Sequence, residues 1–213
     1  MSDLFGWLAT HPGMLARATE QHLNLSLVAL AAVLALGLPG GIGLARHPRL
    51  SGPVLAIVNT LRTIPSLALL VLMLPFLGTG FLPSVVALVL YGLPAVLINA
   101  VSGIASVDPD IEDAARGQGL SERQILFGIS LPLAIPVILA GIRTSAVQIV
   151  SGATLAVFIG GGGLGELISS GMGLLDLNML IVGALAVALL AVATEIVLGI
   201  AERVLVRLYG VSP

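Results

Sequence analysis

The sequence lacks cysteine and lysine and carries little charge of either sign. Only 9% of its 213 residues are charged, and all nine basic residues are arginine, whereas about 25% charge is usual in a soluble domain. The absence of cysteine excludes disulfides, thiolate nucleophiles and cysteine-bound metals. The absence of lysine excludes a Walker-type phosphate loop and Schiff-base chemistry, so the chain has no such route to ATP hydrolysis.

Aromatic residues and clusters of metal ligands are also scarce. Aromatic side chains make up 4% of the chain, and the formal net charge is −2, so a nucleic acid is not an expected partner. His11, His22 and His47 are dispersed along the chain, which argues against a metal site. An intramembrane enzyme would need His, Asp and Ser side chains at the same level of the predicted membrane spans, and the sequence has no such set. We expect neither enzymatic activity nor a cofactor in this chain.

Apolar residues are present in excess. They make up 57% of the chain, more than one core of this size can bury while so few charged residues cover the outside. Lipid is therefore the expected solvent over much of the length. Five stretches contain no charged residue, and they cover 21–45, 63–107, 124–142, 144–165 and 177–194.

The lengths of these stretches predict how often the chain crosses a membrane. A helix needs roughly 20 apolar residues to cross a hydrocarbon core of ~30 Å. The stretch 63–107 is long enough for most of two helices, and the Pro- and Gly-rich segment 75–83 marks the turn between them. We predict an all-α polytopic membrane protein with five transmembrane helices, four being the alternative count. The predicted helices cover 23–45, 53–76, 83–104, 132–158 and 177–204.

The arginines predict the orientation. With five helices, only Arg17 lies on one side, and the remaining arginines outside the spans lie on the other. Because positively charged loops favour the cytoplasm, we expect the N-terminus outside and the C-terminus in the cytoplasm. The arginines on the cytoplasmic side are Arg46, Arg49, Arg116, Arg123, Arg203 and Arg207.

The N-terminal segment differs from the rest of the chain. Residues 1–19 are broken by His11-Pro12-Gly13 and are too short to span, and they lack the features of a signal peptide. We predict an interfacial segment anchored by Trp7. The transmembrane domain then covers 20–213.

Charge is concentrated in the predicted cytoplasmic loop 105–131. Asp108 is suited to cap a short helix that stops near Gly119. The run Ser121–Gln124 has the pattern of a capping box that opens a second short helix. Leu131-Pro132 is expected to end this second helix and to start the fourth span. Two short helices joined at Gly119 would form a rigid projection on the cytoplasmic face.

This loop resembles the cytoplasmic signature of permease subunits in bacterial ABC importers. The signature reads Glu-Ala-Ala, three residues, Gly, nine residues, Ile, one residue, Leu-Pro, and the sequence keeps its spacing with Asp in place of the usual Glu. The resemblance implies that these residues couple the permease to an ATPase. They are Asp113, Ala114, Ala115, Gly119, Ile129, Leu131 and Pro132.

Further motifs resemble the permeases of osmoprotectant importers, which carry glycine betaine, choline, carnitine or proline betaine. One departure is Arg62, where such permeases often have Gln. The resemblance extends over nearly the whole chain and implies a type I ABC importer permease fold. The matching segments are 63–70, 86–91, 107–109 and 152–165.

The resemblance also implies a set of partners. Two permease chains, identical or paralogous, would form the pore in the bacterial cytoplasmic (inner) membrane. Two ATP-binding subunits would hold ATP and Mg, and an extracytoplasmic solute-binding protein would deliver the solute. The permease itself would need no cofactor.

Polar residues inside the predicted spans are candidates for the translocation pathway or its gate. Ionisable groups at membrane depth normally face the bundle interior, and three occur here: Arg62, Arg143 and Glu195. The alternative is a structural ion pair, with Glu195 as the partner of one arginine. Pro65 is expected to kink its helix. The remaining candidates, for which interhelical hydrogen bonding is the alternative, are Asn59, Ser66, Asn99, Gln148, Ser151 and Thr154.

A glycine run follows the fourth span on the predicted outer side. It is expected to form either a flexible outer loop or a re-entrant turn that faces the solute-binding protein. The run consists of Gly160, Gly161, Gly162 and Gly163.

Two other functions stay open at this point. The same kind of importer could carry amino acids, methionine or another betaine. An ion-coupled secondary transporter would need paired acids at mid-membrane and often has inverted repeats. The sequence has one deep acid, Glu195, and no second half, which makes this transporter class the weaker alternative.

Overall fold

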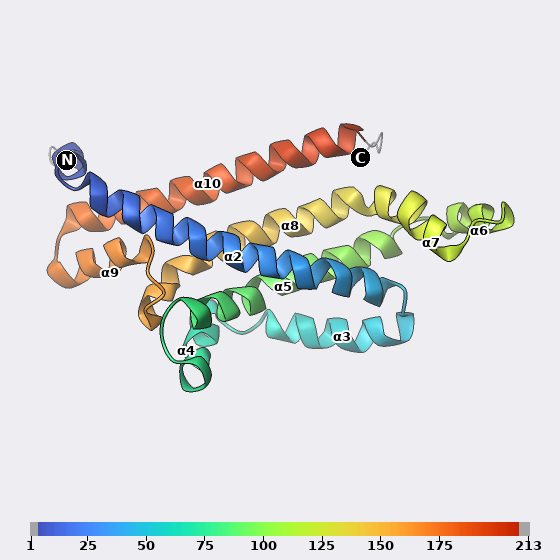
Figure 1. Ribbon diagram of the computed structural model, residues 1–213, viewed down its shortest axis with the longest axis horizontal. Helices are drawn as coiled ribbons and strands as arrows, with labels where there is room; N and C mark the ends of the chain where they lie inside the picture. Colours follow the sequence, from blue (N-terminus) through green and yellow to red (C-terminus); the bar gives the residue numbers. More distant parts are fainter. Residues whose placement is uncertain (1–3, 209–213) are drawn as a thin grey trace.

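The computed structural model describes residues 4–208, and every regular element in that range is a helix. Figure 1 shows an elongated bundle with α1 and α9 at one end and α6 and α7 at the other. Residues 1–3 and 209–213, the outer ends of the predicted segments, lie outside the described residues. The elements are α1 (Leu4–Thr10), α2 (Pro12–Ala45), α3 (Pro48–Leu61), α4 (Ser66–Leu77), α5 (Phe81–Ala105), α6 (Pro109–Gly117), α7 (Glu122–Ile125), η1 (Leu126–Ser130), α8 (Leu131–Ala153), η2 (Thr154–Ile159), α9 (Gly165–Leu174) and α10 (Leu177–Leu208).

Four helical segments of the described chain are long and apolar enough to cross a membrane, and a bent pair of helices can supply a fifth crossing. The pair is α3 and α4, which meet at 95° within the span predicted at 53–76. The predicted count of five therefore holds when this broken pair is one span. The four unbroken candidates are Pro12–Ala45, Phe81–Ala105, Glu122–Ile159 and Leu177–Arg207.

The first long helix begins earlier than the sequence predicted. It starts at Pro12 instead of residue 23, because proline is well accommodated in a first helical turn and charged residues end a hydrophobic stretch without ending a helix. The predicted anchor Trp7 is only 9% exposed and packs in a cluster with residues of α2, α9 and α10. Its indole therefore lies inside the protein; the interfacial location of the segment stays a prediction.

The second predicted span is not one helix. α3 ends in a tight turn in which the Thr63 and Ile64 N–H groups donate to Thr60 and Leu61. Pro65 follows with ψ of 139° and caps α4. Proline has no N–H and disfavours a helical conformation in the residue before it, so the predicted kink becomes a complete break.

Leu131-Pro132 does not end a helix, contrary to the prediction. The chain runs from α7 through the π-helical turn η1 directly into α8, and the Leu131 N–H donates to the carbonyl of Leu126, five residues earlier. A π turn is wider than an α-helical turn, which leaves room for the Pro132 ring. At the other end, the predicted helix 132–158 tightens into the 3-10 helix η2.

The core forms where α2, α4, α5, α8 and η2 meet. Glycines allow the closest approaches: a Cβ on Gly41 of α2 would lie 2.5 Å from the Ala100 Cβ of α5, and one on Gly141 of α8 would lie 2.5 Å from the Asn99 Cβ of α5. In a membrane, small residues of this kind let helix backbones pack closely without help from the hydrophobic effect.

Candidate functional site

The two short helices of the predicted coupling segment are present with their predicted caps. The Asp108 side chain accepts from the Asp110 N–H, and Ser121 and Gln124 form a reciprocal capping box. Gly119 joins the two helices with a φ of +85°, a left-handed conformation that glycine adopts at little cost. The capping predictions are confirmed, and the joint falls where the sequence placed it.

An ion-pair network centred on Arg116 holds the two helices together. Arg116 contacts Glu112 at 3.2 Å, Asp113 at 2.6 Å and Glu122 at 2.8 Å. Arg46, at the end of α2, binds Glu122 at 3.2 Å and also donates to the Glu122 backbone carbonyl. Hydrogen bonds to Glu122 and Asp113 raise the pKa of Arg116 above its ordinary value.

A further hydrogen bond within the coupling segment joins α6 to η1. The buried Ser130 hydroxyl, immediately before α8, donates to Glu112 Oε1 over 2.6 Å. The Arg46 contact therefore fixes the segment to α2, and the Ser130 bond holds α6 against the turn that leads into α8. Sequence analysis named Arg46 only as a cytoplasmic arginine and did not name Ser130, because neither belongs to the signature and a long-range contact leaves no local pattern.

Three of the seven signature residues line an open, mostly apolar groove. Ala114, Ala115 and Ile129 line it together with Ile111 and Leu120. Asp113 is exposed beside it and is paired with Arg116 within the chain. Leu131 and Pro132 are half-buried at the start of α8. The groove is of the kind that an apolar side chain of a partner can fill.

The residues predicted on the second span gather at the α3–α4 break. Asn59, Arg62 and Pro65 are exposed, and Ser66 is half-buried at the first turn of α4. Within the described residues Arg62 takes part in no ion pair. The structure thus does not unite Arg62 with Glu195, one of the pairings that the sequence left open.

The polar candidates on α5 and α8 occupy different environments. Asn99 donates to the Ala95 carbonyl over 2.7 Å and packs against Gly141, so it supports the α5–α8 contact. Gln148 is half-buried and Ser151 is exposed. The Thr154 hydroxyl is buried without a hydrogen-bond partner among the described residues.

Arg143 and Glu195 do form an ion pair, and a third residue joins them. Arg143 Nε donates to Glu195 Oε1 over 2.7 Å, Nη2 contacts the same oxygen, and Nη1 contacts Glu202 Oε2 at 3.0 Å. We call these three residues the α8–α10 charge cluster. Arg143 lies over Gly199, where an added Cβ would be 3.6 Å from Nη1. Glu202 was missed, although its spacing of seven residues from Glu195 places both acids on one helix face.

The glycine run is part of the folded body. Gly162 and Gly163 are buried, and a Cβ on Gly163 would lie 3.1 Å from Nδ1 of His22 on α2. The Gly163 N–H donates to Gln21 Oε1 over 3.2 Å. Gly160, Gly162 and Gly163 have positive φ, so the run is a defined turn. Its predicted contact with a solute-binding protein stays a prediction.

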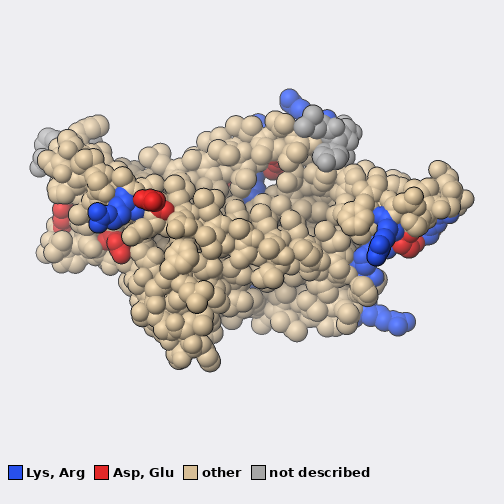
Figure 2. Space-filling view, in the orientation of Figure 1, with Lys and Arg blue, Asp and Glu red and all other residues tan. Residues whose placement is uncertain are grey.

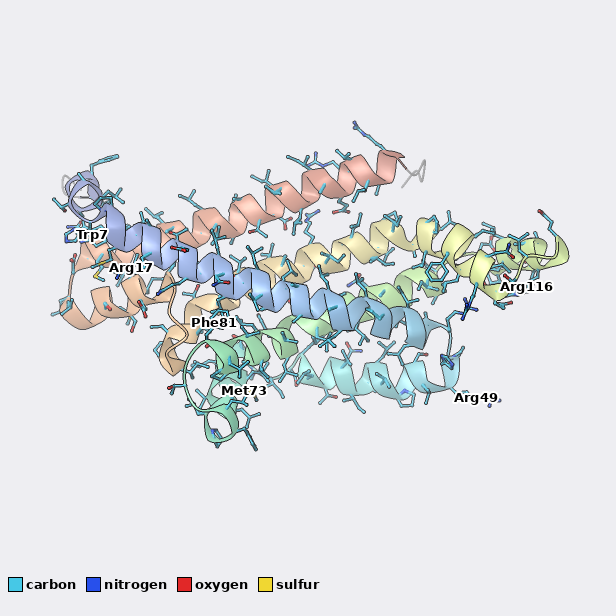
Figure 3. All side chains as sticks on the ribbon, in the orientation of Figure 1. Trp7, Arg17, Arg49, Met73, Phe81 and Arg116 are labelled. Atoms are coloured by element: carbon cyan, nitrogen blue, oxygen red, sulfur yellow. The ribbon has the colours of Figure 1, made fainter. Side chains whose placement is uncertain are left out.

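Many of the charged side chains lie at the two ends of the molecule. Figure 2 shows a wide and mostly uncharged surface between them, interrupted by a small group of charges of both signs. Arg49 and Arg116 lie at one end and Arg17 at the other (Figure 3). Among the described residues, no group of three His, Asp or Glu side chains is placed to hold a metal ion.

Comparison with known proteins places this arrangement in a family. Residues 37–208 match the family described as binding-protein-dependent transport system inner membrane component. The chain belongs to this family. It is therefore a transport permease subunit of the inner membrane.

Relatives in this family match nearly the whole chain. The glycine betaine/carnitine/choline transport system permease protein OpuCB of Bacillus subtilis is 38% identical over 203 residues, which are 95% of this chain and 94% of that protein. The carnitine transport permease protein OpuCB of Listeria monocytogenes is 41% identical, covering 85% and 83%. The osmoprotectant import permease protein OsmW of Salmonella typhimurium is 38% identical, covering 91% and 92%.

Solved structures share the fold of this permease. An inward-facing structure of the MetNI methionine ABC transporter matches with a TM-score of 0.82 at 22% identity, covering 92% of this chain and 98% of the other. An amino acid ABC transporter crystallised with histidines matches with a TM-score of 0.76 at 19% identity, covering 93% and 97%. The predicted type I ABC importer permease fold is confirmed.

Proposed function

We propose that this permease subunit belongs to an ATP-driven, binding-protein-dependent importer of quaternary ammonium solutes such as glycine betaine, choline and carnitine. The observation that carries the solute class is the 38–41% identity with permeases named for these solutes. Two such subunits, identical or paralogous, form the pore, with the N-terminus outside and the C-terminus in the cytoplasm. The gathering of Arg49 and Arg116 at the end opposite Arg17 supports this orientation (Figure 3).

The coupling segment 105–131 binds an ATP-binding subunit that holds ATP and Mg. Two features support this role. The groove lined by Ala114, Ala115 and Ile129 can accept an apolar side chain of the partner, and the capped helices α6 and α7 form a rigid projection that can transmit a movement without unfolding. The solute-binding protein docks at the opposite end, near Gly160–Gly163. The residues around the α3–α4 break, Asn59, Arg62, Pro65 and Ser66, line the translocation pathway or its gate, together with Gln148, Ser151 and Thr154 of α8 and η2.

The test is uptake by the complete transporter in liposomes. The permease is reconstituted with its ATP-binding subunit, the solute-binding protein and labelled choline or glycine betaine. We expect uptake only with ATP and both partners present. Uptake driven by an ion gradient without ATP would contradict this function and favour the secondary transporter. Uptake of methionine or another amino acid in place of both quaternary ammonium solutes would contradict the solute class.

A matched pair of glycine variants tests the coupling segment. Gly117 and Gly119 both have open space around an added Cβ, but only Gly119 has a positive φ. In Gly119→Ala the alanine would need a left-handed conformation that costs roughly 1–2 kcal/mol. We expect the backbone to relieve this strain by tilting α7 relative to α6. We expect solute-stimulated ATP hydrolysis to fall in Gly119→Ala and to stay near the unmodified rate in Gly117→Ala. Equal rates in the two variants would contradict the coupling assignment.

A further inference from the structure

The α8–α10 charge cluster is unbalanced in charge. One arginine, Arg143, is paired with two carboxylates, so the ionised cluster carries a surplus of one negative charge. The neighbouring Arg203 is exposed and donates to the backbone carbonyl of Gly199 over 3.1 Å. Within the described residues it takes part in no ion pair, so it does not neutralise either carboxylate by direct contact.

The cluster is only partly covered by the chain. The side chains of Arg143 and Glu195 are 38% and 43% exposed, and α10 as a whole is the least covered candidate span, with 11% of its apolar window buried. Figure 2 shows charged groups of both signs in a hollow between α10 and the rest of the bundle. A charged group at this depth is costly in hydrocarbon and faces water or a protein interior. The open side of the cluster therefore faces water or another protein surface, and not lipid.

We propose that the open side of the cluster borders the aqueous translocation pathway and that Glu202 sets the charge preference of the permease, because the surplus negative charge there favours passage of cationic over zwitterionic solutes. Arg143 donates twice to Glu195 and once to Glu202, so Glu202 is the acid that can be neutralised while the other pair stays intact. A quaternary ammonium cation is attracted by the surplus charge. The carboxylate of a zwitterion offsets that attraction. This inference rests on the proposed function and concerns which of its solutes moves faster.

The experiment compares choline, a cation, with glycine betaine, a zwitterion, in the same reconstituted transporter. Glu202→Gln keeps the size of the side chain and an oxygen that accepts from Arg143, and it removes the surplus charge. We expect the ratio of kcat/KM for choline to that for glycine betaine to fall about 3- to 10-fold. Arg203→Gln removes a positive charge beside the cluster and should raise the same ratio.

A matched control separates local from overall charge. Glu20→Gln removes one negative charge from an exposed site in the first part of α2, and we expect its ratio to equal that of the unmodified protein. An unchanged ratio in Glu202→Gln, or an equal loss for both solutes, would overturn the proposal and leave Glu202 a structural residue. Uptake of neither solute by the unmodified protein would contradict the proposed solute class itself, and this inference with it.

Discussion

Arg116 and Arg143 each bind more than one carboxylate, but they do so in different surroundings. Arg116 joins Glu112, Asp113 and Glu122 at an exposed end of the molecule. Arg143 joins Glu195 and Glu202 across two long apolar helices. Water and salt screen the first set of charges, whereas the second set lies between two long apolar helices, which leaves its charges more strongly coupled. The same chemistry thus sets the geometry of the predicted coupling segment in one region and holds two membrane helices together in the other.

Removing the arginine of the membrane cluster should have the largest effect. Arg143→Leu leaves two carboxylates close together without a counter-charge, and removing one partner of an ion pair in a low-dielectric region is strongly destabilising. We expect little folded permease, measured as the monodisperse fraction in detergent and by thermal unfolding.

A compensating variant makes this prediction sharper. In Arg143→Leu combined with Glu195→Leu and Glu202→Leu, no charge remains to be solvated, and apolar replacement of a whole ion cluster is often neutral. We expect folded yield to recover while transport stays altered. If the single Arg143→Leu variant unfolds at the same temperature as the unmodified protein, the ion pairs of Arg143 contribute as little to stability as the exposed ion pairs of Arg116, and the contrast between the two sets is wrong.

The close packing of the membrane region predicts the next largest effect. In Gly41→Ala the added methyl group meets the Ala100 Cβ at 2.5 Å, and such overpacking costs about 1–3 kcal/mol. Gly43→Ala, on the same helix with nothing within 4 Å of the new Cβ, should instead stabilise by roughly 0.5–1 kcal/mol through helix propensity. Thermal unfolding of both variants checks the prediction, and the same shift in both would contradict the close α2–α5 contact.

The smallest effect is expected in the coupling segment. Arg116→Gln breaks ion pairs that are exposed to water, and pairs of this kind contribute little to stability. We expect a shift of the unfolding temperature smaller than that of Gly41→Ala, and one that vanishes as salt is raised. Arg123→Gln, which removes an exposed arginine with no ion pair among the described residues, is the control. A salt-independent loss of stability in Arg116→Gln would remove the contrast between the two clusters.

Local sequence predicted what depends on near neighbours. The caps at Asp108 and Ser121, the glycine joint at Gly119 and the last helix from residue 177 are all present, because a cap or a turn is decided within about four residues. The same local rules failed at two prolines. Pro12 begins a helix instead of preceding one, and Pro132 follows a π turn that lets the helix continue through it. Composition alone does not predict that a helix can accept a proline at these positions.

Contacts between distant residues lay beyond local patterns. The bond of Arg46 to Glu122 and that of Ser130 to Glu112 join residues that the sequence separates widely. The glycine run shows the same limit, since its composition left a flexible loop and a re-entrant turn open, while in the structure the Gly163 N–H donates to Gln21 of α2 and His22 lies beside it.

The sequence by itself determined that lipid surrounds much of the chain, that the fold is helical and which family it resembles, because hydropathy and the spacing of a signature are properties of the chain alone. Only the tertiary structure decided that the second span breaks by 95°, that Arg143 and not Arg62 pairs with Glu195, and that Glu202 leaves the cluster with a surplus charge. The physical reason is that an ion pair depends on which helix faces come together. That choice follows from the packing of the whole bundle, including the close glycine contacts of α2 and α8 with α5.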